Sequence, residues 1–407
     1  MTRDLVAAGG FDALTIDGVA RAAKVSRPVV YDLFGDLDGL VTALIDREQQ
    51  IALAPLMALV GTGDPPAGTD PEQFLADVVA GFLAAVRADR TTWKLVLMPP
   101  QGVSQPVRRR FTDTRLAIAD RVAELFAWGL EQRGGPLGLD HELLGRVVVA
   151  VGEDAARLTL RHPRRYSPER MAVALTAALA VLPPGAPRRG TPVPELRIPP
   201  APGPEPAPPA GTRLSKADRR EQLLDVALEL IDEGDWDALS MDAIARRAGV
   251  DRVVVYRCYP KLELLTLALL RREELRTRRL TDAILPARLR VGTPAEIVGG
   301  AVARLLEEVF SRPVTYRVAM RRPESVPPVL QKVVNRRRAA IARRLRPLVE
   351  LGLTGVAGPT EDIDVELLSR MLLSAGEELA RVALNDPAFP PERVLAGAWD
   401  VLDRVPV

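Results

Sequence analysis

The chain of 407 residues has very little of what disulfide and metal chemistry requires. It contains one cysteine, Cys258, which excludes an internal disulfide and a multi-cysteine metal site. Its two histidines, His141 and His162, have no second histidine at ligand spacing, so we expect no metal and no cofactor. The sequence also lacks a GxSxG motif, a glycine-rich phosphate loop, an HExxH motif and a Cys–His arrangement. We therefore expect that the protein is not an enzyme.

Long apolar runs are also absent. No run approaches the roughly 20 residues that a membrane-spanning helix needs. The first residues, MTRDLVAAGGFDALT, have neither the basic start nor the continuous apolar stretch of a signal peptide. We expect a cytoplasmic protein with no membrane partner. The net charge is only +2, so any surface that binds nucleic acid must be local.

What the chain does contain is a long internal repeat. Residues 5–48 align without a gap with residues 230–273, and 20 of the 44 aligned positions are identical. This similarity shows that a unit of about 190 residues is duplicated, because the match returns at two later places. These later matches join residues 91–103 with 314–326 and residues 152–158 with 376–382.

A proline-rich segment, residues 183–213, separates the two copies. Proline lacks an N–H donor and interrupts helices, so we expect an extended linker that could span roughly 90 Å. Outside it, apolar residues recur at three- and four-residue spacing, and we find no convincing alternating strand pattern, which predicts an all-α fold. The expected domains are a head at 1–48, a sensor domain at 49–182, the linker, a second head at 214–273 and a second sensor domain at 274–407.

Residues 239–262, LSMDAIARRAGVDRVVVYRCYPKL, have the pattern of two short helices joined by a tight turn. Ser240 is a good N-cap, Gly249 suits the left-handed residue that ends a helix, and Asp251 can cap the second helix. Val255 and Tyr259 are four residues apart and should face the core. The outer strip of the second helix is then formed by Arg252, Val253, Tyr256 and Arg257.

This outer strip carries the chemistry of DNA recognition. An arginine can bind guanine O6 and N7 with two hydrogen bonds, a valine can contact a thymine methyl group, and a tyrosine hydroxyl can bind phosphate. Two short helices with such a strip are typical of a helix-turn-helix. The alternative is a surface helix of an unrelated bundle, which the repetition of the whole pattern makes less favoured.

The segments ALSMDAIARRAGVDRVVVYRCYPKLELL and ALTIDGVARAAKVSRPVVYDLFGDLDGL resemble the tetracycline-repressor (TetR) family. The resemblance implies two TetR-like units, each with a three-helix DNA-binding head and a helical domain for ligand binding and dimerisation. It implies a double-stranded DNA operator and a small-molecule effector as partners, with repression as the expected effect. The expected DNA contacts are Ser240, Arg252, Val253, Val254, Tyr256, Arg257 and Lys261 in the second copy, and Thr15, Arg27, Pro28, Val29, Tyr31 and Asp32 in the first.

The two copies depart from the family pattern in different ways. The first copy begins at a position equivalent to Val226, so we expect its first helix to be truncated. Leu37 and Leu262 occupy the place where the family often has a phosphate-binding lysine, and only the second copy has a neighbouring substitute, Lys261. At the turn between the helices, Lys24 replaces the glycine of the second copy, which should cause some strain.

The two heads also differ in net charge. Residues 239–262 carry a net charge of +3, whereas the aligned residues 14–37 carry none. The first alternative to two working heads is therefore a regulator in which only the second copy binds DNA. A second alternative is a ligand-binding or interaction protein that does not bind DNA, which Arg252 and Arg257 disfavour.

For the sensor domains, the sequence offers weaker signals. Four side chains are candidates for lining a ligand cavity, although core packing is at least as good an interpretation: Phe82, Trp93, Tyr316 and Met320. We expect the last two helices of each copy to pack together as an intrachain pseudo-dimer, with further oligomerisation possible. The pairs Glu153/Arg157 and Glu377/Arg381 fall in those helices, either as part of that interface or as ordinary surface pairs.

Overall fold

The computed structural model describes residues 14–98, 105–179, 185–198, 200, 214–234, 236–284, 293–321, 328–353 and 364–405. Over these residues it has seventeen α-helices, one short 3-10 helix and no strand, which confirms the all-α prediction. None of the described helices is both long and apolar enough to cross a membrane. The truncated first helix predicted for the first copy falls on residues that the structure does not describe. The chain divides into two compact units, which we describe separately.

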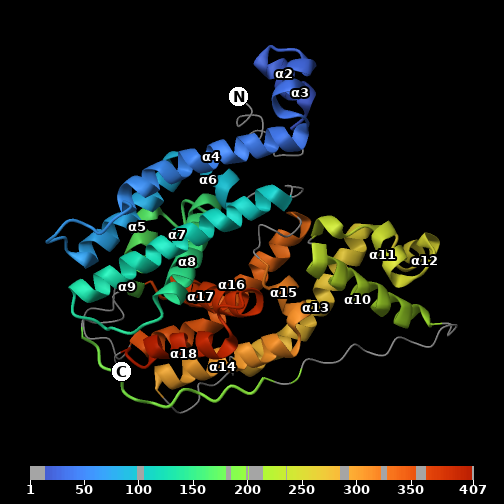
Figure 1. Cartoon of the computed structure of the whole chain (residues 1–407). Helices are drawn as coiled ribbons and strands as arrows, with labels where there is room; N and C mark the ends of the chain where they lie inside the picture. Colours follow the sequence, from blue (N-terminus) through green and yellow to red (C-terminus); the bar gives the residue numbers. More distant parts are fainter. Residues whose placement is uncertain are drawn as a thin grey trace. The chain divides into compact units, whose positions relative to one another are not determined.

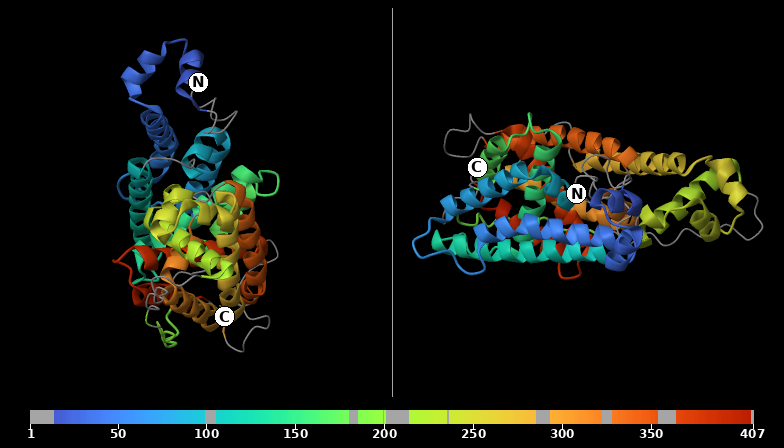
Figure 2. Two further views of the ribbon diagram at one scale, coloured as in Figure 1. Left: turned by 90° about the vertical axis from the view of Figure 1, so that its right-hand side faces the viewer. Right: turned by 90° about the horizontal axis from the view of Figure 1, so that it is seen from above.

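The first unit comprises residues 1–187 and residues 358–375. Its head lies at one end of a long helix, α4, which continues from the head into the sensor domain (Figures 1 and 2). The helices of the first copy are α2 (Ile16–Ala23), α3 (Arg27–Phe34), α4 (Leu37–Val60), α5 (Pro71–Ala88), α6 (Arg90–Leu97), α7 (Gln105–Gln132), α8 (His141–Arg161) and α9 (Pro168–Leu179).

The sequence positions several of these helices through their ends. Asp36 caps α4 by accepting a hydrogen bond from the Gly39 backbone N–H at 2.8 Å. Asp70 caps α5 in the same way, and Pro71 fills the first helical position, where a missing N–H has no cost. Helices α7 and α8 cross closely at Gly145, where a Cβ atom would lie 2.3 Å from the Ala119 carbonyl oxygen.

The second unit comprises residues 188–357 and residues 376–405. Its head shares a core with the sensor domain, because Val318 and Leu330 are buried in the same cluster as the head residues Ile244 and Val255. The helices of the second copy are α10 (Lys216–Gly234), η2 (Trp236–Ala238), α11 (Met241–Ala248), α12 (Arg252–Cys258), α13 (Leu262–Ile284), α14 (Pro294–Ser311), α15 (Pro313–Ala319), α16 (Pro328–Leu353), α17 (Val365–Asn385) and α18 (Pro391–Leu402).

Helix α17 belongs to both units. Its residues up to Ala375 are part of the first unit, and Gly376 begins the part that belongs to the second. In the first unit, Leu367 of α17 is buried together with Tyr166, close to the start of α9. The Tyr166 hydroxyl donates a hydrogen bond of 2.7 Å to Glu366. The beginning of α17 is thus anchored in the core of the first unit.

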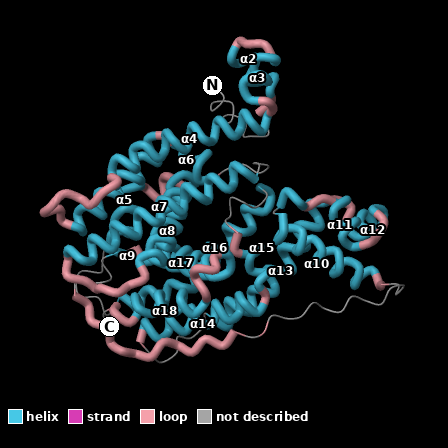
Figure 3. Tube along the Cα trace, viewed as in Figure 1, coloured by secondary structure: helices cyan, strands magenta, loops and turns pink. Residues whose placement is uncertain are grey.

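The described part of the proline-rich linker is bound to the second sensor domain. The Asp403 carboxylate is completely buried and accepts hydrogen bonds from the Gly190 and Thr191 backbone N–H groups and from the Thr191 hydroxyl. Trp399 of α18 donates from its indole nitrogen to the Thr191 carbonyl at 3.0 Å. Further on, the Arg197 N–H donates to Glu307 of α14. Residues 188–198 therefore form a strap along α18 and α14, drawn as a pink loop in Figure 3.

The hydrogen bonds from the strap favour the charged form of Asp403. Burial alone raises the pKa of Asp403, but the hydrogen bonds from Thr191 and Gly190 outweigh it and hold that pKa below its ordinary value. The carboxylate is therefore ionised at neutral pH, when its hydrogen bonds to the strap are strongest.

Replacing Asp403 should release the strap. In Asp403→Ala, tryptic cleavage after Arg189 should become roughly tenfold faster, because hydrogen bonds to a charged group contribute about 1.5–3 kcal/mol and their loss populates the opened strap. The measurement is the rate of limited proteolysis, with the cleavage site read by mass spectrometry. Glu195→Ala is the control, since exposed Glu195 pairs with Arg197 within the strap itself. Equal acceleration in both variants would contradict this account.

Candidate nucleic-acid interface

The two helices of the helix-turn-helix in the second copy are capped by the residues that the sequence predicts. The Ser240 hydroxyl accepts a hydrogen bond from the Ala243 N–H, and Asp251 accepts one from the Val253 N–H at 2.7 Å. Gly249 lies between the two helices in the left-handed region with φ 64°. Ser240 therefore defines the start of α11, and Gly249 and Asp251 define the turn between α11 and α12.

Helix α12 separates its core face from its outer face as predicted. Val255 and Tyr259 are buried, and Cys258 is buried beside them. Arg220 of α10 lies over the Tyr259 ring, with its guanidinium carbon 4.3 Å from the ring centre. The predicted contact residues are placed as follows: Arg252, Val253, Tyr256, Arg257 and Lys261 are exposed, as is Ser240, and Val254 is half-buried.

The side chain of Arg252 is held in place before any ligand arrives. Its Nε atom lies 3.0 Å from the Asp242 carboxylate of α11, and its Nη2 atom donates to the Tyr256 hydroxyl at 3.1 Å. The guanidinium carbon is also 5.3 Å from the centre of the Tyr256 ring. The outer strip is therefore an ordered group of one arginine and one tyrosine, with its remaining guanidinium donors available.

The head of the first copy repeats this geometry. Thr15 caps α2 by accepting from the Gly18 N–H at 3.0 Å, and Arg27 of α3 pairs with Asp17 of α2. Lys24 adopts the left-handed conformation with φ 56°, the conformation that Gly249 has in the second copy. The turn thus keeps its shape although a side chain is present, with the strain that the sequence predicts.

The outer face of α3 differs in chemistry from that of α12. Tyr31 is 51% exposed and Leu33 is 70% exposed, and Val29 is exposed as well. Pro28 and Asp32 complete this face, and both are exposed. The predicted contact residues of the first copy are thus exposed, and as a set they are more apolar and less basic than those of the second copy.

The aspartate partners of the recognition arginines were not among the expected site residues. Asp17 and Asp242 each precede their arginine by ten residues, so both copies preserve the same spacing. That repeated spacing is the signal that could have identified them. Their effect is to orient the guanidinium groups of Arg27 and Arg252.

In the sensor domains, the four candidate ligand residues lie in two separate places. Phe82 and Trp93 meet edge to face in the first unit, with ring centres 5.3 Å apart. Tyr316 is buried in the second unit, where Met320 packs against the same apolar cluster. The Tyr316 hydroxyl faces Glu308 at 3.5 Å. Each pair is thus embedded among the helices of its own sensor domain.

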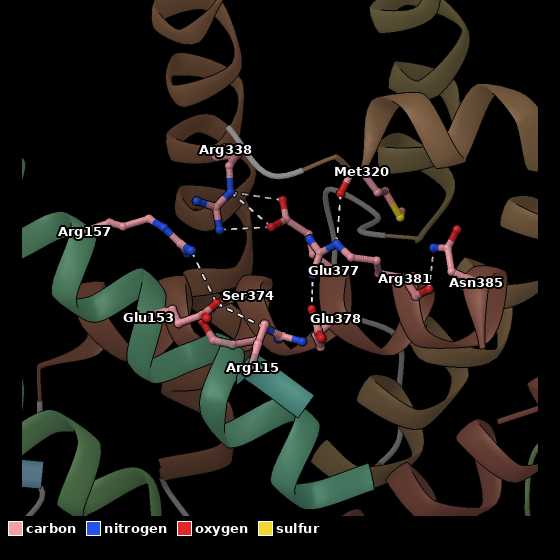
Figure 4. A network of polar contacts seen from close by, with 11 residues as sticks. Arg115, Glu153, Arg157, Met320, Arg338, Ser374, Glu377, Glu378, Arg381 and Asn385 are labelled. Atoms are coloured by element: carbon pink, nitrogen blue, oxygen red, sulfur yellow. Dashed lines mark hydrogen bonds and ion pairs between the residues drawn. The ribbon is translucent and has the colours of Figure 1, made fainter. Parts of the chain in front are cut away.

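Both sensor domains contain a similar network of arginines and glutamates (Figure 4). In the first unit, Glu153 accepts from Arg115 and Arg157, each at 3.3 Å, which confirms the predicted Glu153/Arg157 pair. In the second unit, Glu377 pairs with Arg338, and Arg381 pairs with Glu378 of the same helix.

The arginine of this network makes one further bond in each copy. Arg157 donates from Nε to the Leu97 carbonyl at 3.1 Å, and Arg381 donates from Nε to the Met320 carbonyl at 3.1 Å. Both acceptors lie at the C-terminal ends of short helices, α6 and α15, where carbonyl groups lack partners within the helix. The duplication has thus preserved a polar link between two helices of the sensor domain.

A match to a protein family agrees with the presence of two heads. The chain matches the family of "Bacterial regulatory proteins, tetR family" at residues 1–44 and again at residues 223–268. No curated protein matches it. Among solved structures, a TetR-like transcriptional regulator from Rhodococcus sp. RHA1 is 26% identical with a TM-score of 0.33, over 44% of this chain and 91% of that one. A second transcriptional regulator from Rhodococcus sp. Rha1 is 20% identical with a TM-score of 0.33, over 46% of this chain and 95% of the other. Since the family match covers both heads, the chain contains two domains of the tetR family of bacterial regulatory proteins in tandem.

Proposed function

We propose that this regulator is a ligand-responsive repressor that binds, as a single-chain pseudo-dimer, an operator with two unlike half-sites. The observation that carries the proposal is the pair of heads with the same anchored arginine but different outer faces. Arg252 and Arg27 are each held by an aspartate one helix away, whereas the residues around them differ in charge and polarity. One polypeptide then supplies two recognition helices that read different sequences.

The anchored arginine supports sequence-specific binding. A guanidinium that is already ordered by Asp242 and Tyr256 loses little conformational entropy when it contacts a base. Its planar donors match guanine O6 and N7 in the major groove. Exposed Arg257 and Lys261 can neutralise phosphates on either side, which supplies affinity without base preference.

Helix α17 supports the pseudo-dimer. Its first part is buried in the first unit with α9, and its remainder continues into the second sensor domain. The family pairs its subunits through the last two helices, and here a single chain provides both sets. We infer that the two heads are thereby presented to successive major-groove faces, roughly 34–36 Å apart.

Contacts between the second head and its sensor domain support a response to a ligand. Arg317 of α15 binds Asp232 of α10 with two hydrogen bonds, at 2.7 and 2.8 Å. Arg321 donates to the Ile231 carbonyl at 2.7 Å. A small molecule that shifts α15 would therefore shift α10 as well, and it would change DNA affinity through its preference for one arrangement.

A second candidate function is favoured by the exposed face of α3. Val29, Tyr31 and Leu33 are exposed apolar side chains in a head whose aligned segment has no net charge. In this alternative only the second head binds DNA, and the first copy is a structural or sensing partner.

The experiment that tests the proposal is selection of bound DNA from a random pool, followed by footprinting of the selected sequence. The proposal expects protection of two half-sites of different sequence. Protection of one half-site supports the alternative, and the absence of any selected sequence contradicts both.

Arg252 should determine base preference. Arg252→Ala should cost about 1–3 kcal/mol of binding free energy on the selected site and relax base choice at one position, because a two-bond base contact is lost. Tyr256→Phe should weaken binding more evenly across sequences. Arg247→Ala is the control, since Arg247 pairs with Glu233 of α10. The measurement is fluorescence anisotropy on the selected site and its single-base variants. Unchanged affinity and preference in the folded Arg252 variant would refute the assignment.

One polypeptide should occupy one operator, because the duplication replaces a partner chain. Native mass spectrometry of the complex with a minimal operator should show one chain per duplex. Two chains on that site would mean that the copies pair between molecules and not within one.

The two heads should contribute unequally to binding. Tyr256→Ala should lose more affinity than Tyr31→Ala, because the second head carries the larger positive charge and phosphate neutralisation supplies much of the binding free energy. The salt dependence of binding should also be determined mainly by the second head. Binding titrations at several salt concentrations measure both effects. Equal losses from the two variants on a palindromic operator would show that the heads are equivalent.

A further inference from the structure

An arginine in the second sensor domain lies among the helices and forms no ion pair with any carboxylate that the structure describes. Arg337 of α16 donates from Nη2 to the Thr277 hydroxyl of α13 at 2.6 Å. Over the part of the chain that the structure describes, its guanidinium forms no ion pair. Burial lowers the pKa of Arg337, and the fields of Glu274 and Glu377 only partly compensate. Desolvating a charge in this way is costly unless another charge pairs with it.

Among the described residues, neither Glu274 nor Glu377 forms an ion pair with Arg337, although both raise its pKa. Glu377 is engaged by Arg338, whose Nε atom lies 3.1 Å from both carboxylate oxygens and whose Nη2 atom lies 2.9 Å from one of them. Glu308 faces the Tyr316 hydroxyl. The guanidinium of Arg337 has four N–H donors besides the one given to Thr277 and a full charge, so it can accept an anion with two parallel hydrogen bonds.

The first copy has no equivalent of this arrangement. Because Arg338 aligns with Arg115, the position of Arg337 is held by Thr114. Trp93 takes the place of Tyr316, and it packs in an apolar cluster that includes Ala52, the residue aligned with Thr277. The duplicated sensor domains have therefore diverged at these positions, where the first copy has threonine, tryptophan and alanine and the second has arginine, tyrosine and threonine.

We propose that the second sensor domain binds an organic acid whose carboxylate pairs with Arg337, and that the first sensor domain does not bind it. This inference rests on the proposed function as a ligand-responsive regulator. Tyr316 lies beside the site, and its neighbour Arg317 holds Asp232 of the head. Occupancy at Arg337 therefore acts on the helix that positions the second head.

The test uses the full chain and matched pairs of an acid and its primary amide: benzoic acid with benzamide, 4-phenylbutanoic acid with its amide, and decanoic acid with its amide. At least one acid should raise the melting temperature of the wild-type protein by about 2 °C or more, and its amide should not. Arg337→Met should abolish the shift. Arg336→Met is the matched control, because Arg336 is the preceding residue of the same helix and is exposed. It should respond like the wild type.

Two further readouts separate a binding role from a structural one. Unliganded Arg337→Met should melt at or above the wild-type temperature, since it removes a charge that burial desolvates, and it should keep its affinity for the selected operator. The active acid should weaken operator binding by the wild type and not by Arg337→Met. The inference is overturned if no acid stabilises the wild type, if amides act equally, or if Arg337→Met keeps the shift or melts lower. If the unliganded wild type does not bind an operator at all, the proposed function is overturned, and the result on acid binding still stands.

Discussion

The sensor domains depend on one repeated interaction, the hydrogen bond from a helix arginine to the end of a short helix. Arg157 donates to the Leu97 carbonyl in the first copy, and Arg381 donates to the Met320 carbonyl in the second. The bond satisfies a carbonyl that its own helix leaves unpaired, and it places a positive charge at the negative end of the helix dipole. Because α6 packs on α4 and α15 packs on α10 and α13, this bond also links a later helix of each sensor domain to the helices that adjoin the head.

Around this common frame the two copies have diverged at the residues that contact ligands. The heads share an arginine–aspartate pair and a left-handed turn, but only the second head surrounds its arginine with further positive charge. The sensor domains share the arginine–glutamate network, but they differ beside it. The first copy has Trp93 among apolar side chains, whereas the second has Tyr316 and the charged side chain of Arg337. A homodimer cannot vary its two halves separately, whereas a tandem chain can, since each copy is encoded by its own codons.

The connection between the copies is also more ordered than its composition indicates. Proline and glycine exclude helix from the linker, and they do not exclude tertiary contacts. The buried carboxylate of Asp403 accepts three hydrogen bonds from Gly190 and Thr191. Trp399 also binds this segment, by donating a hydrogen bond to the Thr191 carbonyl. Residues 188–198 of the linker are therefore a fixed element of the second sensor domain, so the full length of the linker overstates its reach.

The sequence by itself determined the duplication, the all-α fold and the outer strip of each recognition helix. These follow from local rules, because capping, helical periodicity and glycine at a left-handed turn act within a few residues, and the repeat supplies each rule twice. Only the tertiary structure decided that α17 is divided between the units, that the strap binds Asp403, and that Arg337 lacks a carboxylate partner among the described residues. Those facts join residues up to about two hundred positions apart, and no local pattern specifies which distant side chain will meet another.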